Sequence, residues 1–188
     1  MATTAGVEGL APFPSNPRPV PDTARLQARG IGLRHAHAGD LPWIAALYAS
    51  TREDELAAVP WPQAMREAFL AQQFALQHRH YLAHYGDSDF LVVETAHGPI
   101  GRLYVQPARP AHLLVDVSLV PGARNQGIGA MLVAGAQSRA AAEGCGMQLH
   151  VAVHNPAAQR LYARLGFEVD ADEGAYRRMR WPAPRPLS

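Results

Sequence analysis

The chain has 188 residues, of which 48% are hydrophobic and 18% are charged, and its formal net charge is +1. This composition is typical of one soluble globular domain and excludes a wholly disordered or collagen-like chain. The nearly balanced charge gives no sign of a nucleic-acid partner.

Membrane-spanning and export segments indicate a protein's location in the cell. No run approaches the roughly 20 apolar residues of a membrane-spanning helix, and the N-terminus lacks the basic and apolar segments of an export signal. We therefore expect a cytoplasmic protein with no membrane partner. Cys145 is the only cysteine, so no intramolecular disulfide can form, which fits a reducing compartment. There is no lysine, and all 17 basic residues are arginine.

The first 30 residues are rich in proline and have few periodic apolar positions. We expect neither a helix nor a central strand there, but a mobile or surface-draped arm over residues 1–30. A role as a proline-rich ligand stays open. The domain itself is expected over residues 31–181, with a short tail at 182–188.

Regular elements are predicted from residue 31 onward. A short strand at 31–34 precedes Asp40, a candidate N-cap, and Pro42 in the first turn of a helix. The buried face of this helix is expected to hold Trp43, Ile44 and Leu47. A second helical region at 52–84 is interrupted by Pro60 and Pro62, and its apolar stripe is expected to be Met65, Phe69 and Leu76.

Strand signals then alternate with helical ones. Residues 90–95 and 100–106 are predicted to form a hairpin, and 113–120 a third strand. The later elements are predicted as a helix at 126–143, a strand at 148–153, a helix at 156–165, and strands at 167–170 and 176–181. Antiparallel pairs come first and a parallel crossover later, so we expect an α/β (α+β) fold with a mixed, mostly antiparallel sheet flanked by helices.

A glycine-rich loop at residues 120–132 is the most specific stretch. It leads from a buried strand into a helix, and Gly127 and Gly129 lie at the start of that helix, where backbone N–H groups lack helical partners. Small side chains there would let a diphosphate approach the amides, with the helix dipole in support. Arg124 would add charge-assisted hydrogen bonds.

Two better-known phosphate loops do not fit this stretch. A nucleotide P-loop requires a lysine, which the chain lacks. A dinucleotide fingerprint requires a third glycine where Leu132 stands, and an acid at the end of the next strand, which instead ends at His154 and Asn155. A turn that merely packs helix on strand stays open.

A second motif follows at residues 155–167. Asn155 is predicted as the N-cap of a helix and Gly166 as its C-terminal stop. Tyr162 is expected to point inward, with its hydroxyl in need of a polar partner. If Gly166 closes a Schellman turn, Phe167 packs back onto the Tyr162 ring.

Together, the two motifs resemble the Gcn5-related N-acetyltransferase (GNAT) family, which transfers an acetyl group from acetyl-coenzyme A to an amine. R-N-Q-G-I-G is similar to that family's Q/R-x-x-G-x-G/A pyrophosphate loop, and N-x-x-A-x-x-L-Y-x-x-x-G-F to its late helix. The resemblance covers about residues 31–181. It implies that the strands before and after the loop helix splay apart and that the coenzyme enters the gap.

The resemblance also implies roles for individual residues. Backbone groups at the end of the strand before the loop would face the pantetheine arm, loop amides would hold the diphosphate, and the start of the late helix would border the arm. Tyr162 would protonate the leaving thiolate. The implied coenzyme-binding residues are Leu119, Val120, Arg124, Asn125, Gln126, Gly127, Ile128, Gly129, Ala130, Asn155, Ala158 and Tyr162.

The acceptor side is less defined by the sequence. Asp116 is a candidate general base because it interrupts an apolar run, although the solvent face of an alternating strand is an equal alternative. Glu53 and Glu55 are candidates for the acceptor mouth, or mere dipole partners at a helix start. The acceptor would be a primary amine of a small molecule or peptide. A catalytically silent coenzyme-binding module is the alternative function, and a homodimer stays open.

Other reactive side chains are given structural roles. His78, His80 and His84 lie close in sequence but lack an acidic third ligand in a metal-binding pattern, so no metal is expected. Cys145 is expected to be a buried or partly buried small residue rather than an acyl carrier.

Overall fold

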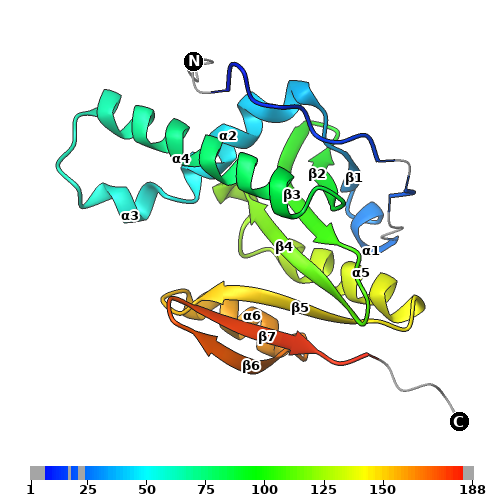
Figure 1. The fold of residues 1–188 in the computed structure, drawn as a ribbon. Coiled ribbons are helices and arrows are strands. Elements are labelled where there is room, and N and C mark those ends of the chain that lie inside the picture. The colour runs from blue at the N-terminus through cyan, green and yellow to red at the C-terminus, as the bar shows by residue number, and fades with distance from the viewer. Residues whose placement is uncertain (1–6, 17, 21–23, 184–188) are drawn as a thin grey trace, which may run out of the picture.

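The computed structural model describes residues 7–16, 18–20 and 24–183 (Figure 1). The helices are α1 (Ala24–Gln27), α2 (Leu41–Ser50), α3 (Glu53–Ala57), α4 (Gln63–His84), α5 (Ile128–Ala142) and α6 (Pro156–Arg164). The strands are β1 (Gly32–His35), β2 (Asp89–Thr95), β3 (Gly98–Gln106), β4 (Ala111–Leu119), β5 (Gly146–Ala152), β6 (Glu168–Glu173) and β7 (Tyr176–Trp181). Short 3-10 turns, η2 (Ala38–Asp40) and η3 (Pro121–Ala123), precede α2 and α5. No helix of the described residues is long and apolar enough to cross a membrane.

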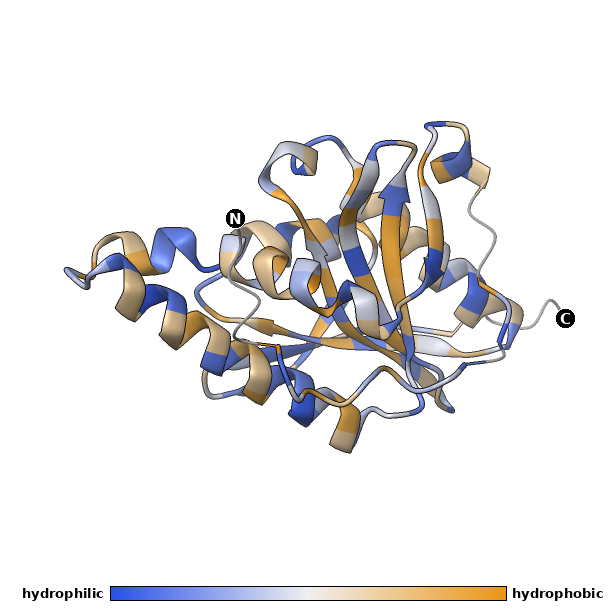
Figure 2. Ribbon diagram, turned by 90° about the horizontal axis from the view of Figure 1, so that it is seen from above, coloured by the Kyte–Doolittle hydropathy of each residue, from blue (hydrophilic) through white to orange (hydrophobic). Residues whose placement is uncertain are grey.

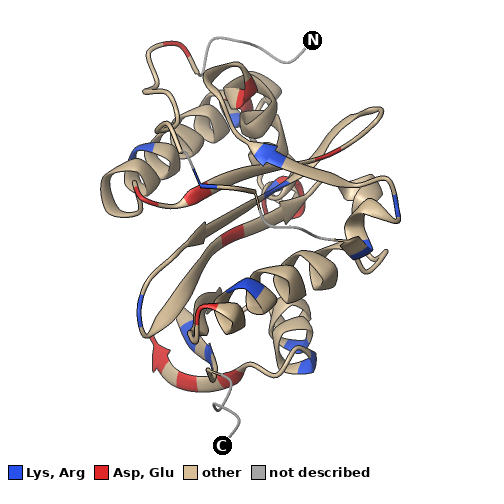
Figure 3. Cartoon of the chain, turned by 90° about the vertical axis from the view of Figure 1, so that its right-hand side faces the viewer, with Lys and Arg blue, Asp and Glu red and all other residues tan. Residues whose placement is uncertain are grey.

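The strands form one sheet in the order β1-β2-β3-β4-β5-β7-β6. Only the β4–β5 pair is parallel, and every other neighbouring pair is antiparallel. The predicted mixed, mostly antiparallel sheet is confirmed. At one edge of the sheet, acidic side chains of β6 pair with arginines of β7. Figure 3 shows the acidic residues as red bands along this edge strand.

Two apolar clusters cover the two faces of the sheet. One contains side chains of α1, α5 and α6 packed on alternate positions of the strands, and the other contains side chains of α2 and α4 packed on the intervening positions. Leu91 and Val93 of β2 face the first cluster, whereas Phe90 and Val92 face the second. Period-two alternation thus produces the two-layered core, and the central strands are the most hydrophobic part of the ribbon in Figure 2.

The sheet opens in its middle, between β4 and β5. The two strands pair at four consecutive positions, from Ala111↔Gly146 to Leu114↔Leu149, and no further pair follows although both strands continue. Val115 is a bulge, because Val105 of β3 pairs with Leu114 while Tyr104 pairs with Asp116. Figure 1 shows the two strands close together at one end and well separated at the other. The predicted splay is confirmed, and it begins at the bulge.

The N-terminal arm differs from the prediction. Contrary to the prediction of no helix, Ala24–Gln27 is helical, and Leu26 is fully buried in the cluster around α5. Phe13 is also buried, and its ring packs edge-on against His78 of α4, with the ring centres 5.1 Å apart. Two isolated apolar residues carry no periodic signal, which explains why the pattern missed them. The expected tail at 182–188 lies mostly outside the described residues.

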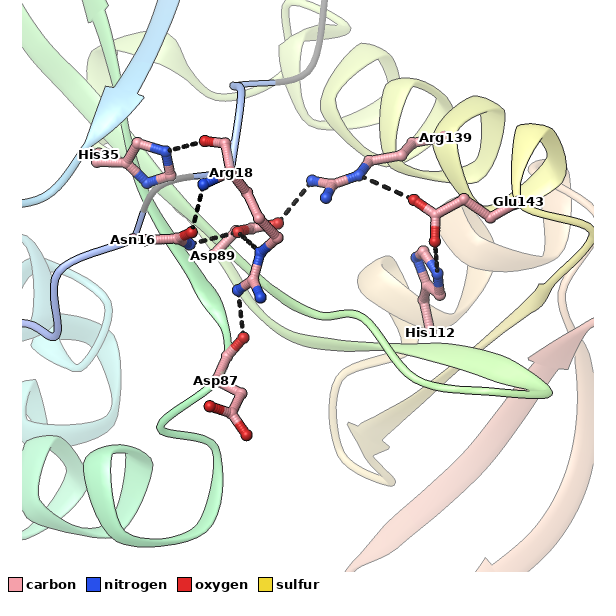
Figure 4. A network of polar contacts seen from close by, with 8 residues as sticks. All are labelled: Asn16, Arg18, His35, Asp87, Asp89, His112, Arg139 and Glu143. Atoms are coloured by element: carbon pink, nitrogen blue, oxygen red, sulfur yellow. Dashed lines mark hydrogen bonds and ion pairs between the residues drawn. The ribbon is translucent and has the colours of Figure 1, made fainter.

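A buried carboxylate fastens this arm to the sheet (Figure 4). Asp89, at the start of β2, accepts hydrogen bonds from Asn16 and from Arg18, whose Nε lies 2.7 Å from Oδ1. Arg139 of α5 reaches the other oxygen at 2.6 Å. Burial opposes the charge, but the hydrogen bonds from Arg18 and Asn16 and the charge of Arg139 outweigh it and lower the pKa of Asp89.

We expect Asp89→Asn to lower the free energy of unfolding at pH 7 by about 2 kcal/mol, because it leaves two partly exposed arginines without their carboxylate. A folded-state pKa below the unfolded value of 3.8 gives stability that is present above that pH and lost as the pH falls through the folded value. The difference between wild type and variant should therefore be constant near neutral pH and shrink below about pH 3.8. Urea unfolding across pH checks this, and a constant difference down to pH 2 contradicts it.

The early helices differ from the prediction in detail. Pro60 and Pro62 do separate α3 from α4, but the apolar stripe assigned to α4 is wrong, because Met65 and Leu76 are exposed and Phe74 and His78 are buried. The first turns of α4 extend past the sheet (Figure 1), and there Phe69 packs on Trp61, with ring centres 5.2 Å apart, rather than on the sheet. Asp40 precedes α2 as expected, yet its side chain does not cap α2. It accepts from the His37 amide at the start of η2 and pairs with Arg34.

Candidate active site

The loop between β4 and α5 is built from local turns. Val120 is held to β3 by its amide on the Ile100 carbonyl, and η3 follows it. Asn125 and Gly127 then adopt left-handed backbone, with φ of 59° and 77°. At Gly127 the backbone conformation, and not a lack of space, explains the glycine. A Cβ there would meet nothing within 4 Å, but residues with a side chain rarely adopt this φ.

Six consecutive amides, from Asn125 to Ala130, donate no hydrogen bond to any other described residue. Helix α5 starts at Ile128, so the last three of these are the unpaired donors of its first turn, reinforced by the helix dipole. Such a run of free donors is suited to an anion with several oxygens, such as a diphosphate.

Gly129 is not required by the packing of the protein. A Cβ built on it would lie 3.9 Å from Leu161 and 4.0 Å from Leu119, which is ordinary contact. The position therefore faces the space between the end of β4 and α6. A glycine inside a helix costs about 1 kcal/mol of helix stability relative to alanine. Packing within the protein does not account for this cost, whereas a ligand bound beside Gly129 would. These observations fit the diphosphate and arm of coenzyme A.

Arg124 is differently engaged from the expectation. Its Nε donates to the Leu119 carbonyl at 2.9 Å and its Nη2 to the Ser50 carbonyl at 3.2 Å. The guanidinium thus ties the loop to the end of β4 and to the last residue of α2. Its direct contact with the diphosphate stays a prediction.

Helix α6 begins and ends at the capping residues predicted from the sequence. The Asn155 side chain accepts from the Ala158 amide at 3.0 Å, and Pro156 is the first helical residue. Gly166 has φ of 83°, and the amide of Phe167 reaches the Tyr162 carbonyl at 3.0 Å, which completes the Schellman turn. The Phe167 ring meets the Tyr162 ring edge-on, with centres 5.9 Å apart. The predicted support of Tyr162 is confirmed.

The Tyr162 hydroxyl is free to meet a ligand. The residue is 9% exposed, and its hydroxyl has no hydrogen-bond partner among the described residues, yet it is not one of the enclosed polar atoms that lack a partner. It therefore opens to solvent while the ring is buried. Burial, together with the charge of Asp116, raises the pKa of Tyr162 to about 12. The phenol is therefore protonated at neutral pH.

Asp116, the candidate base, lies in a dense polar cluster. Its carboxylate accepts from Nε and Nη2 of Arg102, at 3.2 and 2.7 Å. It also accepts from the Tyr81 hydroxyl at 2.9 Å and from the Ser118 hydroxyl at 2.7 Å. Its side chain is 11% exposed and that of Arg102 is 3% exposed. Four donors occupy the roughly four lone-pair sites of a carboxylate, which leaves none for an incoming amine proton.

The partners of Asp116 were missed by the sequence reasoning. Arg102 stands alone in the apolar run of β3, and its guanidinium also bonds Gln77 of α4 and lies over the Tyr104 ring. Burial raises the pKa of Tyr81 strongly, with a further contribution from the charge of Asp116. An unpaired charge in each of two adjacent predicted strands was the available signal. The cluster joins α4 to β3 and β4 beside the splay.

The remaining candidates make no hydrogen bond to Asp116 or Arg102. Glu53 and Glu55 are exposed on α3, and Glu55 pairs with Arg52 at 2.9 Å. His78 is buried and bonded to the Ala11 carbonyl, and no group of three metal-binding side chains occurs in the described part of the chain. Cys145 is buried and has a free thiol.

A mixed sheet that opens after its fourth strand, with a loop of unpaired amides at the opening, is the arrangement of the acetyltransferase fold class. The chain belongs to the acetyltransferase (GNAT) family, whose model matches residues 44–167. No curated protein matches the sequence.

Solved structures share the fold at low identity. PaiA N-acetyltransferase from Thermoplasma acidophilum in complex with coenzyme A is 18% identical with a TM-score of 0.64, and the match covers 81% of this chain and 98% of that one. An acetyltransferase from Thermus thermophilus is 18% identical with a TM-score of 0.59, covering 81% and 96%. Spermidine N-acetyltransferase from Vibrio cholerae, with coenzyme A and spermine, is 20% identical with a TM-score of 0.54, covering 81% and 94%.

Proposed function

We propose that the protein is an N-acetyltransferase that transfers an acetyl group from acetyl-coenzyme A to a primary amine of a small molecule or peptide. The single observation that carries this proposal is the run of six unpaired amides where the sheet opens. The thioester supplies an activated acetyl group, and the amine would attack it directly while both substrates are bound. A cytoplasmic location and a homodimer stay predictions.

The proposed coenzyme site uses backbone more than side chains. Amides of Asn125 to Ala130 hold the diphosphate, and the end of β4 at Leu119 and Val120 borders the pantetheine arm on one side. Asn155 and Ala158, at the start of α6, border it on the other. The arm then ends near Tyr162.

In this arrangement Tyr162 donates a hydrogen bond to the sulfur as negative charge develops on it. With a pKa of about 12, the phenol is a weaker acid than a thiol of pKa about 8.5, so complete proton transfer to the thiolate would cost about 5 kcal/mol. We therefore assign Tyr162 to stabilisation of the departing sulfur, with the amine's own proton completing the thiol.

The acceptor must lose a proton before it attacks. This costs about 4–5 kcal/mol at neutral pH for an aliphatic amine of pKa near 10.4 and about 1 kcal/mol for an α-amine. Because four donors occupy the Asp116 carboxylate, we propose that Asp116 positions α4 and β4 rather than accepts this proton. Glu53 and Glu55 are proposed to attract a cationic acceptor to the side of α3.

The occupied carboxylate also favours a second candidate function, a coenzyme-binding module without catalysis. Calorimetry with coenzyme A and thiol release from acetyl-coenzyme A across a panel of amines separate the two. Binding with amine-dependent thiol release supports the enzyme, and binding without release for any amine supports the silent module. No binding of coenzyme A contradicts both.

Substituting Gly129 tests the coenzyme site directly. We expect Gly129→Leu to leave thermal stability nearly unchanged, because leucine is a better helix former and a Cβ here makes only ordinary contact with Leu119 and Leu161, at the space between β4 and α6. The same side chain should weaken coenzyme A binding at least about tenfold by filling that space. Gly122→Leu, in the same loop where a Cβ meets nothing within 4 Å, is the matched control for calorimetry. Equal affinities of the two variants would contradict the site.

A further inference from the structure

An exposed arginine from the N-terminal arm touches the loop that carries the unpaired amides. Arg29 is exposed, and its Nη1 donates to the backbone carbonyl of Gln126 at 2.8 Å. Residue 29 is 97 positions earlier in the chain than its partner. The contact therefore depends on how the arm is folded and is not a local turn.

The backbone fixes Arg29 at this place. After α1, the Gly30 amide reaches the Gln27 carbonyl at 2.9 Å and the Ile31 amide reaches the Leu26 carbonyl at 3.0 Å, which is a Schellman turn. Leu26 and Ile31 are buried on either side of Arg29, in the same cluster as Ile128 at the start of α5. In Figure 1, α1 lies directly beside α5.

The charge around Arg29 is suited to an anion. Neither α1 nor residues 120–130 contain an acidic side chain, and Arg29 has no ion pair among the described residues. Its one hydrogen bond is to a neutral carbonyl, so most of the five guanidinium donors stay available. Arginine presents these donors in a fork that matches the geometry of a phosphate.

The two sides of the loop indicate which phosphate Arg29 would meet. Gly129 faces Leu119 and Leu161, the side that leads toward Tyr162, whereas the Gln126 carbonyl faces α1. If the diphosphate lies on the amides and the sulfur points toward Tyr162, the nucleotide end of coenzyme A would extend away from Tyr162, toward α1. That end carries the 3′-phosphate.

We propose that Arg29 binds the 3′-phosphate of coenzyme A, so that the N-terminal arm forms part of the coenzyme site. This inference rests on the proposed function, because it requires the diphosphate to lie on the loop amides. It makes Arg29 a residue that distinguishes coenzyme A from 3′-dephospho-coenzyme A.

Calorimetry with both ligands tests the proposal on the full chain. We expect the wild type to bind coenzyme A about tenfold more tightly than 3′-dephospho-coenzyme A, and Arg29→Gln to reduce this ratio to near one. Arg25→Gln, an exposed arginine of α1, is the matched control and should keep the wild-type ratio. Circular dichroism melting confirms that each variant is folded.

The outcomes separate the two proposals. If the wild type binds both ligands equally, or if Arg29→Gln weakens both by the same factor, the role of Arg29 is wrong while the coenzyme site stands. If the wild type binds neither ligand, the proposed function itself fails, and this inference fails with it.

Discussion

Replacing Tyr162 with phenylalanine should lower kcat about a hundredfold while coenzyme A affinity stays within a few-fold. The substitution removes only the hydroxyl, which opens to solvent from a ring that Phe167 holds in place. Loss of one hydrogen-bond donor to developing negative charge typically costs about 10²–10³ in kcat. The ring contact and the coenzyme loop are unaffected, so binding should change little. Steady-state thiol release and calorimetry on the same preparation measure the two effects.

Tyr176→Phe is the matched control, because Tyr176 is an exposed tyrosine of β7, with 52% of its surface accessible. It should keep the wild-type kcat. An unchanged kcat for Tyr162→Phe with a fully active amine would remove the phenol from the mechanism, and a large loss of coenzyme binding would instead make it a binding residue.

Breaking the Asp116 cluster should destabilise the protein severely. Asp116→Ala leaves the Arg102 guanidinium, which is 3% exposed, without its carboxylate, and a buried charge that loses its partner typically costs about 3–5 kcal/mol. For a chain of this size the loss corresponds to a decrease in Tm of about 6–20 °C. Urea unfolding of Asp116→Ala and of Arg102→Met measures how much the free energy of unfolding falls when either partner of the ion pair is removed.

The double variant separates structure from catalysis. Removing both charges should recover much of the stability lost in Asp116→Ala, because no buried charge is then left unpaired. A pH profile of Asp116→Asn tests the base directly, and a positioning role predicts that the acidic limb of kcat/KM does not move. If that limb shifts and the double variant stays inactive despite restored stability, Asp116 is the general base after all.

The later half of the fold could be predicted because its signals are local. Asn155, Pro156 and Gly166 act within one or two turns of α6, and the glycines of the loop report a backbone conformation and an open space at their own positions. The mixed, mostly antiparallel sheet was predicted from the alternation of strands and helices, and the splay from the family resemblance. Both are confirmed.

The polar cluster and the arm could not be predicted in this way. Asp116 is completed by Tyr81 and Arg102, which are 35 and 14 positions away, and the packing that brings α4 onto β4 is not a property of either segment. Asp89 likewise accepts from Asn16, Arg18 and Arg139, which come from two distant parts of the chain. A sequence shows that such charges exist, but the tertiary packing decides which of them meet.

The separation of β4 from β5 leaves two strand edges facing each other across the interior of the sheet. Past Leu114 and Leu149, each edge offers main-chain groups that belong to no particular amino acid. We expect the peptide-like amides of the proposed coenzyme arm to pair there as a substitute strand, so that substitutions along these edges are tolerated wherever the chain path is kept. Solved structures that are only 18% and 20% identical to this chain share its fold, which fits a sheet whose opening is built from main chain.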